Sequence, residues 1–81
     1  MAPDLAQSSS RDRAQAAASF EDALLTGRGQ LQAGRVVEAL QAYHQALSQS
    51  PDSIEALNAV AVCYDRLGKF DSSRTYYEMA L

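Results

Sequence analysis

Two side chains in this sequence, His44 and Cys63, belong to types that often catalyse reactions or bind metals. His44 could serve as a general base, but no Ser, Cys or carboxylate is spaced with it in a nucleophile–base pattern. One His and one Cys are too few for a structural zinc site, which needs three or four such ligands. We therefore expect no catalytic residue, no cofactor and no metal. We expect His44 to face solvent on a helix and Cys63 to pack as a small apolar group.

The segment TGRGQ, residues 26–30, is the nearest approach to a phosphate-binding loop. It has neither the Rossmann glycine spacing nor the Gly-Lys-Ser/Thr ending of a P-loop. Gly27 suits a close contact between helices, whereas Gly29 inside a helix costs up to about 1 kcal/mol relative to Ala. The segment therefore predicts a weak turn of a helix and not a nucleotide site.

The composition limits the classes of function. The chain has 81 residues, enough for one small domain, and a formal charge of −3 from seven basic and ten acidic residues. The basic residues are not clustered, which disfavours nucleic acid as a partner. We find no run of about twenty apolar residues and no secretory signal pattern, so we expect no membrane span and a cytoplasmic location.

Apolar spacing of three and four predicts helices along most of the chain. Residues 1–10 are expected to be a disordered tail and residues 11–19 a helical extension or linker, so the first helix begins near Arg11 or near Phe20. Gly34 and Gly68 should end helices in the left-handed conformation. Asp52 and Asp71 are the predicted N-caps of the third and fourth helices.

The four predicted helices each carry one apolar stripe, and no strand or hairpin signal is present. The fold class is therefore all-α. The stripes contain Phe20, Ala23, Leu24, Gly27 and Leu31, then Val36, Ala39, Leu40, Tyr43, Ala46 and Leu47, then Ile54, Leu57, Ala61, Tyr64 and Leu67, and finally Phe70, Tyr77, Ala80 and Leu81.

The sequence repeats itself with a period of thirty-four residues. This shift aligns Gly34 with Gly68, Arg35 with Lys69, Val36 with Phe70, Tyr43 with Tyr77, Ala46 with Ala80 and Leu47 with Leu81. A period of this length is typical of stacked helical hairpins.

The repeating residues resemble the tetratricopeptide repeat family, with its Trp-x2-Leu-Gly-x2-Tyr, Ala-x3-Phe and Pro pattern. In residues 20–53 the matches are Gly27, Ala39 with Tyr43, Ala46 and Pro51. In residues 54–81 the matches are Leu57, Val60, Ala61, Tyr64, Tyr77 and Ala80. Ala23, Thr26 and Gln30 depart from the pattern, so the first helix is the weakest match. The resemblance implies two repeats of antiparallel helical hairpins, stacked as an α-solenoid, with Tyr43, Tyr64 and Tyr77 filling spaces between adjacent hairpins.

The resemblance also implies a function, because in this family the first helix of each hairpin lines a concave face that binds proteins. The matching residues are Glu21, Leu24, Leu25, Arg28, Gln32, Glu55, Asn58, Val62, Asp65 and Arg66. Lysines of a carboxylate clamp are absent here, so a helix or extended peptide of a partner protein suits this mixed face better. Ala-rich helices of this kind suggest bacterial secretion or pilus assembly as the setting.

Two alternatives remain for the role of these repeats. They could be the N-terminal accessory region of a larger enzyme or assembly factor, or a self-associating helical array. The second repeat stops at Leu81, inside its second helix, so its Tyr77, Ala80 and Leu81 would present an uncapped apolar face. We therefore expect either a fragment of a longer array, or a partner or second copy that covers the last hairpin.

Overall fold

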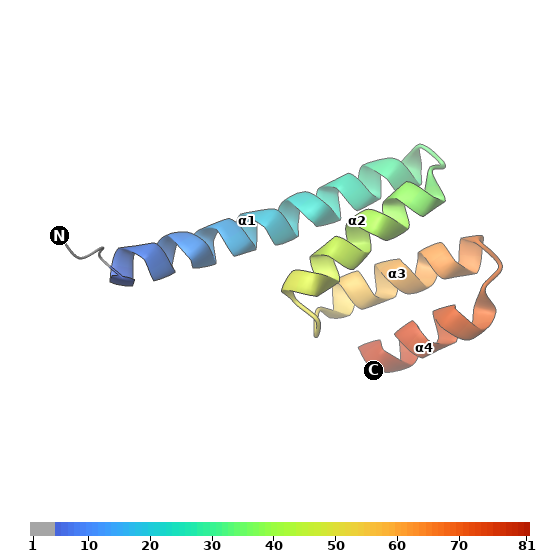
Figure 1. Cartoon of the computed structure of the whole chain (residues 1–81). Coiled ribbons are helices and arrows are strands. Elements are labelled where there is room, and N and C mark those ends of the chain that lie inside the picture. The colour runs from blue at the N-terminus through green and yellow to red at the C-terminus, as the bar shows by residue number, and fades with distance from the viewer. Residues whose placement is uncertain (1–4) are drawn as a thin grey trace.

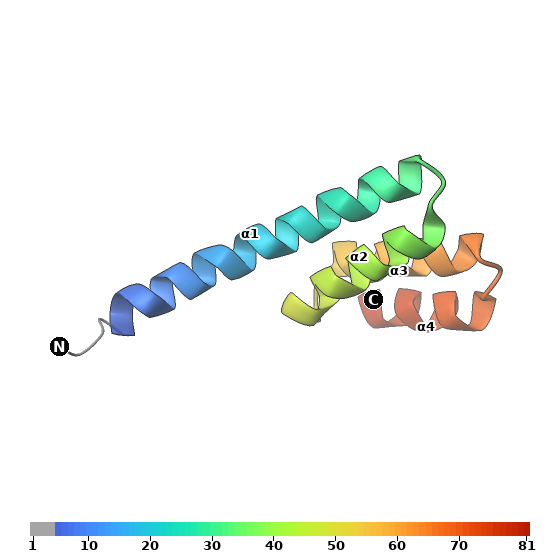
Figure 2. The same ribbon diagram turned by 45° about the horizontal axis from the view of Figure 1, so that its top comes forward.

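The computed structural model describes residues 5–81, with side chains described from Ser19 onward, and its architecture is all-α as predicted. In this range the chain forms α1 (Leu5–Gln32), α2 (Val36–Gln49), α3 (Ile54–Arg66) and α4 (Phe70–Ala80). Each helix packs against the next in chain order, and successive helices run antiparallel (Figures 1 and 2). The short turns between helices enforce this arrangement, because they return the chain directly along the preceding helix.

Both glycine caps are confirmed. Gly34 and Gly68 have φ values of 81° and 74°, and no other described residue has a positive φ. A side chain at these positions would crowd the backbone in the left-handed conformation, which glycine adopts freely. The amide of Arg35 donates to the Gln30 carbonyl at 2.8 Å, and that of Lys69 donates to the Tyr64 carbonyl at 2.9 Å. The same closing bond thus ends the first helix of each hairpin.

The predicted helix starts need three corrections. The N-cap of α3 is Ser53 and not Asp52, since the hydroxyl of Ser53 accepts a hydrogen bond from the Ala56 amide at 3.2 Å. α4 begins at Phe70, which puts Asp71 inside the first turn, where its charge still favours the helix N-terminus. α1 begins at Leu5, earlier than either predicted start, because no Gly or Pro lies between Leu5 and Gly27. Residues 5–10 are therefore helical; residues 1–4 of the predicted tail lie outside the described part.

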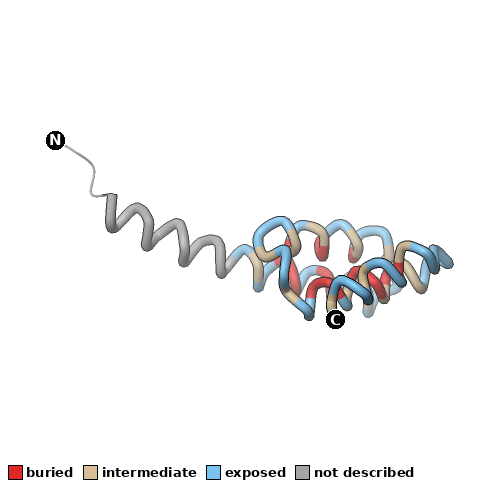
Figure 3. The backbone as a smooth tube through the Cα atoms, turned by 90° about the horizontal axis from the view of Figure 1, so that it is seen from below, coloured by how far each residue is buried: buried red, intermediate tan, exposed pale blue. Residues whose placement is uncertain are grey.

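The core lies between the helices, where the buried stretches of backbone gather (Figure 3). It combines small residues with Leu24, Val60 and the ring of Tyr43. Ala39, Ala46 and Ala56 are completely buried, and their small side chains let the helix backbones approach closely. Tyr43 of α2 lies over Gly27 of α1, where an added Cβ would stand 2.5 Å from ring carbon Cε1. Gly27 is thus the packing glycine that the sequence predicts.

An aromatic cluster joins α2, α3 and α4, and it corrects two predictions. His44 does not face solvent: it is half-buried, its Nε2 lies 3.3 Å from the Tyr64 hydroxyl, and its ring packs edge-on to Tyr64 and Tyr76. Tyr64 and Tyr76 stack with their centroids 5.6 Å apart. Tyr76, and not Tyr77, is therefore the α4 tyrosine that packs on the core. Because α4 offers only one side to α3, its inner residues are Ser73, Tyr76 and Ala80.

The predicted stripes of the last two helices also include residues that the structure exposes. Ile54 is 61% exposed at the start of α3, and Phe70 is 64% exposed at the start of α4. Both residues follow a turn, and no described element covers either of them. The prediction that these two residues belong to buried stripes is therefore wrong, because periodicity cannot tell whether a neighbouring helix lies over the end of a stripe.

Cys63 is buried completely in the interface between α2 and α3, which confirms that it packs as a small apolar group. Burial raises the pKa of its thiol above the usual value of 9.0, and Arg66 offsets only part of this effect. The thiol therefore stays protonated at neutral pH and is a poor nucleophile.

This raised pKa predicts a loss of stability in alkali. As the pH rises past 9.0 the unfolded chain releases the Cys63 proton while the folded chain keeps it, so the free energy of unfolding falls. We expect the urea midpoint to decrease from about pH 8 to about pH 10 in the wild type and less steeply in Cys63→Ala. Equal slopes for the two proteins would show that other groups cause the decrease.

Candidate functional site

Four of the five predicted partner-binding residues of α1 lie on one side of that helix. Glu21, Leu25, Arg28 and Gln32 follow a spacing of three and four, and all four are exposed. Leu25 is the apolar member, with 59% of its surface exposed. This stripe presents a carboxylate, a guanidinium, an amide and an isobutyl group to a potential partner.

Leu24 does not belong to this stripe, and the structure corrects its assignment. Only 2% of its surface is exposed, and it packs in the core with Ala23 and Tyr43. One helix position is a rotation of about 100°, which carries Leu24 inward while Leu25 points outward. Leu24 therefore positions α1 and makes no surface contact.

The predicted residues of α3 form a second stripe. Glu55, Asn58 and Arg66 are exposed, while Val62 and Asp65 are half-buried. α3 packs on α2 through one side and on α4 through another, so only its remaining side can carry these polar groups. We call the nine exposed or half-buried residues the first-helix surface, which comprises Glu21, Leu25, Arg28, Gln32, Glu55, Asn58, Val62, Asp65 and Arg66.

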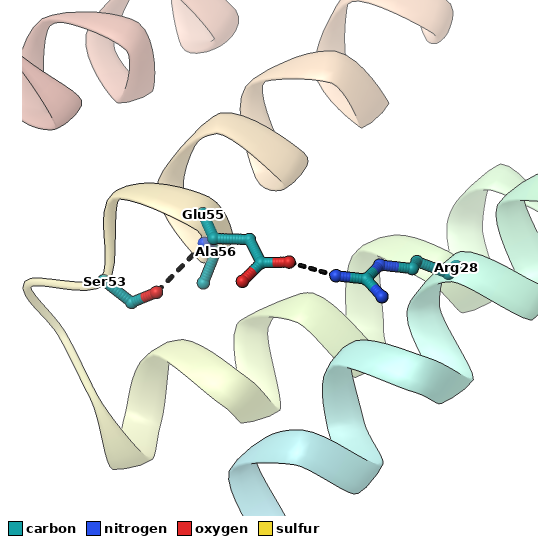
Figure 4. Close-up of polar contacts among 4 residues, drawn as sticks. All are labelled: Arg28, Ser53, Glu55 and Ala56. Atoms are coloured by element: carbon teal, nitrogen blue, oxygen red, sulfur yellow. Dashed lines mark hydrogen bonds and ion pairs between the residues drawn. The ribbon is translucent and has the colours of Figure 1, made fainter.

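An ion pair joins the two stripes. The Arg28 guanidinium of α1 donates to Oε1 of Glu55 in α3, although these helices are not sequence neighbours (Figure 4). Glu55 directly precedes Ala56, whose amide donates to the hydroxyl of the N-cap Ser53, so Glu55 lies in the capped first turn of α3. Both side chains stay about half exposed, and an exposed pair of this kind contributes at most about 1 kcal/mol. Its main consequence is geometric: the two stripes adjoin on one side of the stack.

The far edge of this surface reaches α4. The Tyr77 hydroxyl donates to Oδ2 of Asp65 at 3.1 Å. Burial of the ring and this hydrogen bond raise the pKa of Tyr77 above 10.0. The bond fixes the Asp65 carboxylate beside α4, where it closes one edge of the first-helix surface.

A cleft of about 260 Å³ lies on another side of α1, between α1 and α2. Its walls are Ser19, Asp22, Ala23, Thr26, Gln45 and Gln49. Ala23 and Thr26 stand where the repeat pattern has Trp and Leu, so small side chains there leave the space open. The sequence contained this signal as two departures from the pattern, but we did not interpret them as a cleft.

Several kinds of site are not found in the described part of the chain. Residues 5–81 contain no helix with both the length and the apolar composition of a membrane span. The described side chains do not bring three His, Cys, Asp or Glu residues together for a metal ion.

Comparison with known families settles what these hairpins are. The profile described as tetratricopeptide repeat matches residues 30–81, which is more than half of the chain. The chain belongs to the tetratricopeptide repeat family. Repeats of this family are non-catalytic and mediate contacts between proteins, which makes the chain a protein-interaction repeat. Searches of curated proteins and of solved structures each found no match.

The matched range shows where the tetratricopeptide pattern is strongest. It begins at Gln30, near the end of α1, and runs through α4. The unmatched part of α1 contains Ala23 and Thr26, the departures that line the cleft. The weaker match of the first helix thus has a structural counterpart in the cleft between α1 and α2.

Proposed function

We propose that this tetratricopeptide chain binds a peptide or an amphipathic helix of a partner protein on its first-helix surface. The observation that carries the proposal is the Arg28–Glu55 ion pair, which joins the exposed stripes of α1 and α3 into one surface. A surface spanning two helices is long enough to hold several side chains of a bound segment.

The composition of the surface supports an amphipathic partner. Leu25 and Val62 supply apolar contact, while charges of both signs surround them. A partner helix with apolar residues at intervals of three and four would contact both apolar side chains and pair its polar residues with the rim. Neither sign of charge dominates, so we expect affinity to depend only modestly on salt.

The test uses a displayed library of amphipathic peptides selected against the purified chain. We expect Leu25→Asp to weaken binding of a selected peptide at least about tenfold, because it places an unpaired charge in the apolar contact. Titration calorimetry measures the change, and NMR shift mapping on the wild type locates the peptide.

Val37→Asp is the matched control. Val37 is 51% exposed on α2, close to the 59% of Leu25, and lies outside the first-helix surface. We expect this variant to bind the peptide as the wild type does. Equal losses in the two variants, or shifts confined to α2 and α4, would contradict the proposed site.

The proposed setting is a cytoplasmic complex, with bacterial secretion or pilus assembly as its narrower form. A single buried thiol without a disulfide partner suits a reducing compartment. The narrower setting rests on the similarity of the Ala-rich helices alone. Identification of the proteins that co-purify with the chain from its own cells tests both.

A further inference from the structure

One side of α4 carries an exposed stripe that lies outside the first-helix surface. Phe70, Arg74 and Tyr77 of α4 and its C-cap Leu81 follow one another at intervals of four, three and four residues, so they lie along one side of the helix. All four are exposed, Phe70 to 64%. We call these four residues the α4 stripe.

The same four repeat positions are covered in the first hairpin. Their counterparts are Val36, Leu40, Tyr43 and Leu47 of α2, and all of these pack in or against the core. Tyr43 is 3% exposed, whereas its counterpart Tyr77 is 36% exposed. The difference arises because α3 lies against α2, and the described chain has no helix in the corresponding place beyond α4. Within the described residues, the α4 stripe is therefore a helix-packing surface that no helix covers.

The α4 stripe differs from its counterpart in chemical character at one position, and this difference bears on the kind of partner. Arg74 replaces Leu40, so the order along the stripe is apolar, cationic, aromatic, apolar. This order is complementary to itself when reversed. Two antiparallel copies of α4 crossing between Arg74 and Tyr77 place Phe70 of each copy on Leu81 of the other. They also place each guanidinium over the facing tyrosine ring, a favourable cation–π contact.

The flanking charges agree with this arrangement. Glu78 lies one turn after Arg74 on the solvent side of the stripe, and it is exposed. In the antiparallel pair Glu78 of one copy comes beside Arg74 of the other. In the single chain the side chain of Arg74 lies 3.7 Å from that of Asp71, and both side chains are highly exposed. Such an ion pair is weak, so Arg74 can leave Asp71 and pair with Glu78 of a second copy at little cost.

We propose that the α4 stripe binds a second copy of this chain in an antiparallel, two-fold symmetric helix pair. A two-fold interface uses the same patch on both copies, which requires the self-complementary order that the stripe has. One helix of 11 residues from each copy buries less area than the roughly 1,200 Å² of a stable standard interface, so the dimer is weak and concentration-dependent.

A charge exchange tests this proposal directly. Arg74→Glu places acidic side chains at both positions 74 and 78 of each copy, and Glu78→Arg places basic side chains at both positions, while Asp71 stays unchanged in both variants. We expect each variant alone to dissociate at least about tenfold more readily than the wild type, because like charges then face each other. An equimolar mixture of the two variants should restore association, since both cross-pairs become opposite in sign. Sedimentation velocity measures the affinities, and native mass spectrometry identifies the mixed dimer by mass.

Three controls keep the outcome decisive. Met79→Ser changes an exposed apolar residue of α4, 57% exposed, on the side opposite the stripe, whereas Phe70→Ser changes one within it. We expect only Phe70→Ser to weaken the dimer, and circular dichroism should show that every variant keeps its helices. Leu25→Asp should leave the dimer unchanged, which separates this contact from the first-helix surface.

Three results would overturn the proposal. The first is a wild-type chain that stays monomeric up to about 1 mM, which would leave the stripe to a different protein. The second is a wild-type dimer whose charge variants form no mixed dimer. The third is an equal effect of Phe70→Ser and Met79→Ser, which would place the contact elsewhere.

Discussion

Gly27→Ala is expected to destabilise the chain by about 1–3 kcal/mol, although alanine has the higher helix propensity. The added methyl group would lie 2.5–2.7 Å from three ring carbons of Tyr43. That ring is 3% exposed and packed between helices, so it cannot move aside without loss of contacts. For a domain of this size the loss corresponds to a decrease in Tm of roughly 4–8 °C per kcal/mol.

Gly29→Ala is the matched control and should have the opposite effect. No atom lies within 4 Å of an added Cβ at Gly29, and the residue is exposed in the last turn of α1. We expect a gain of up to about 1 kcal/mol from helix propensity and from the smaller entropy of the unfolded chain. Urea unfolding of both variants checks the pair. If both substitutions stabilise the chain, the contact between Tyr43 and Gly27 is not tight in solution.

Leu24→Ala is expected to cost about 2–5 kcal/mol, because it leaves a cavity in the core beside Tyr43. A small domain has little stability to lose, so this variant should be partly or fully unfolded at room temperature. Circular dichroism during thermal and urea unfolding measures the effect.

Its neighbour Leu25→Ala should change stability by no more than about 0.5 kcal/mol, because its side chain is mainly in solvent. The same variant should weaken binding of a peptide selected for the first-helix surface. The two variants together distinguish Leu24, which stabilises the fold, from Leu25, which contacts a partner. A similar loss of stability in both variants would contradict the burial that distinguishes them.

The neighbours Leu24 and Leu25 also show how far residue patterns predict the site. Alignment with the family pattern placed both on the partner-binding face. The family resemblance identifies which helix lines the binding face, but it does not separate neighbouring residues of that helix. The boundary between core and surface lies between these two residues. Packing against Tyr43 assigns Leu24 to the core, and this contact comes from a different helix.

Tyr77 and His44 also show that residue patterns do not predict burial. The repeat equates Tyr77 with Tyr43, and the two residues do occupy equivalent helix positions. Their surroundings differ because α3 covers Tyr43, whereas the described chain has no helix that covers Tyr77 in the same way. His44, taken for a surface residue, lies among the rings of Tyr64 and Tyr76, which come from two later helices.

The thirty-four-residue repeat can be read directly from the sequence, and residue type indicated Gly27 as a packing position. Local chemistry alone was sufficient for the helices and the two glycine caps. These features depend on backbone conformation, helix propensity and side-chain size within a few turns of chain. Three features depended on the packed structure: the separation of Leu24 from Leu25, the aromatic cluster around His44 and the uncovered stripe of α4. Each of these depends on which helix lies beside a given face, and that contact joins residues far apart in the chain.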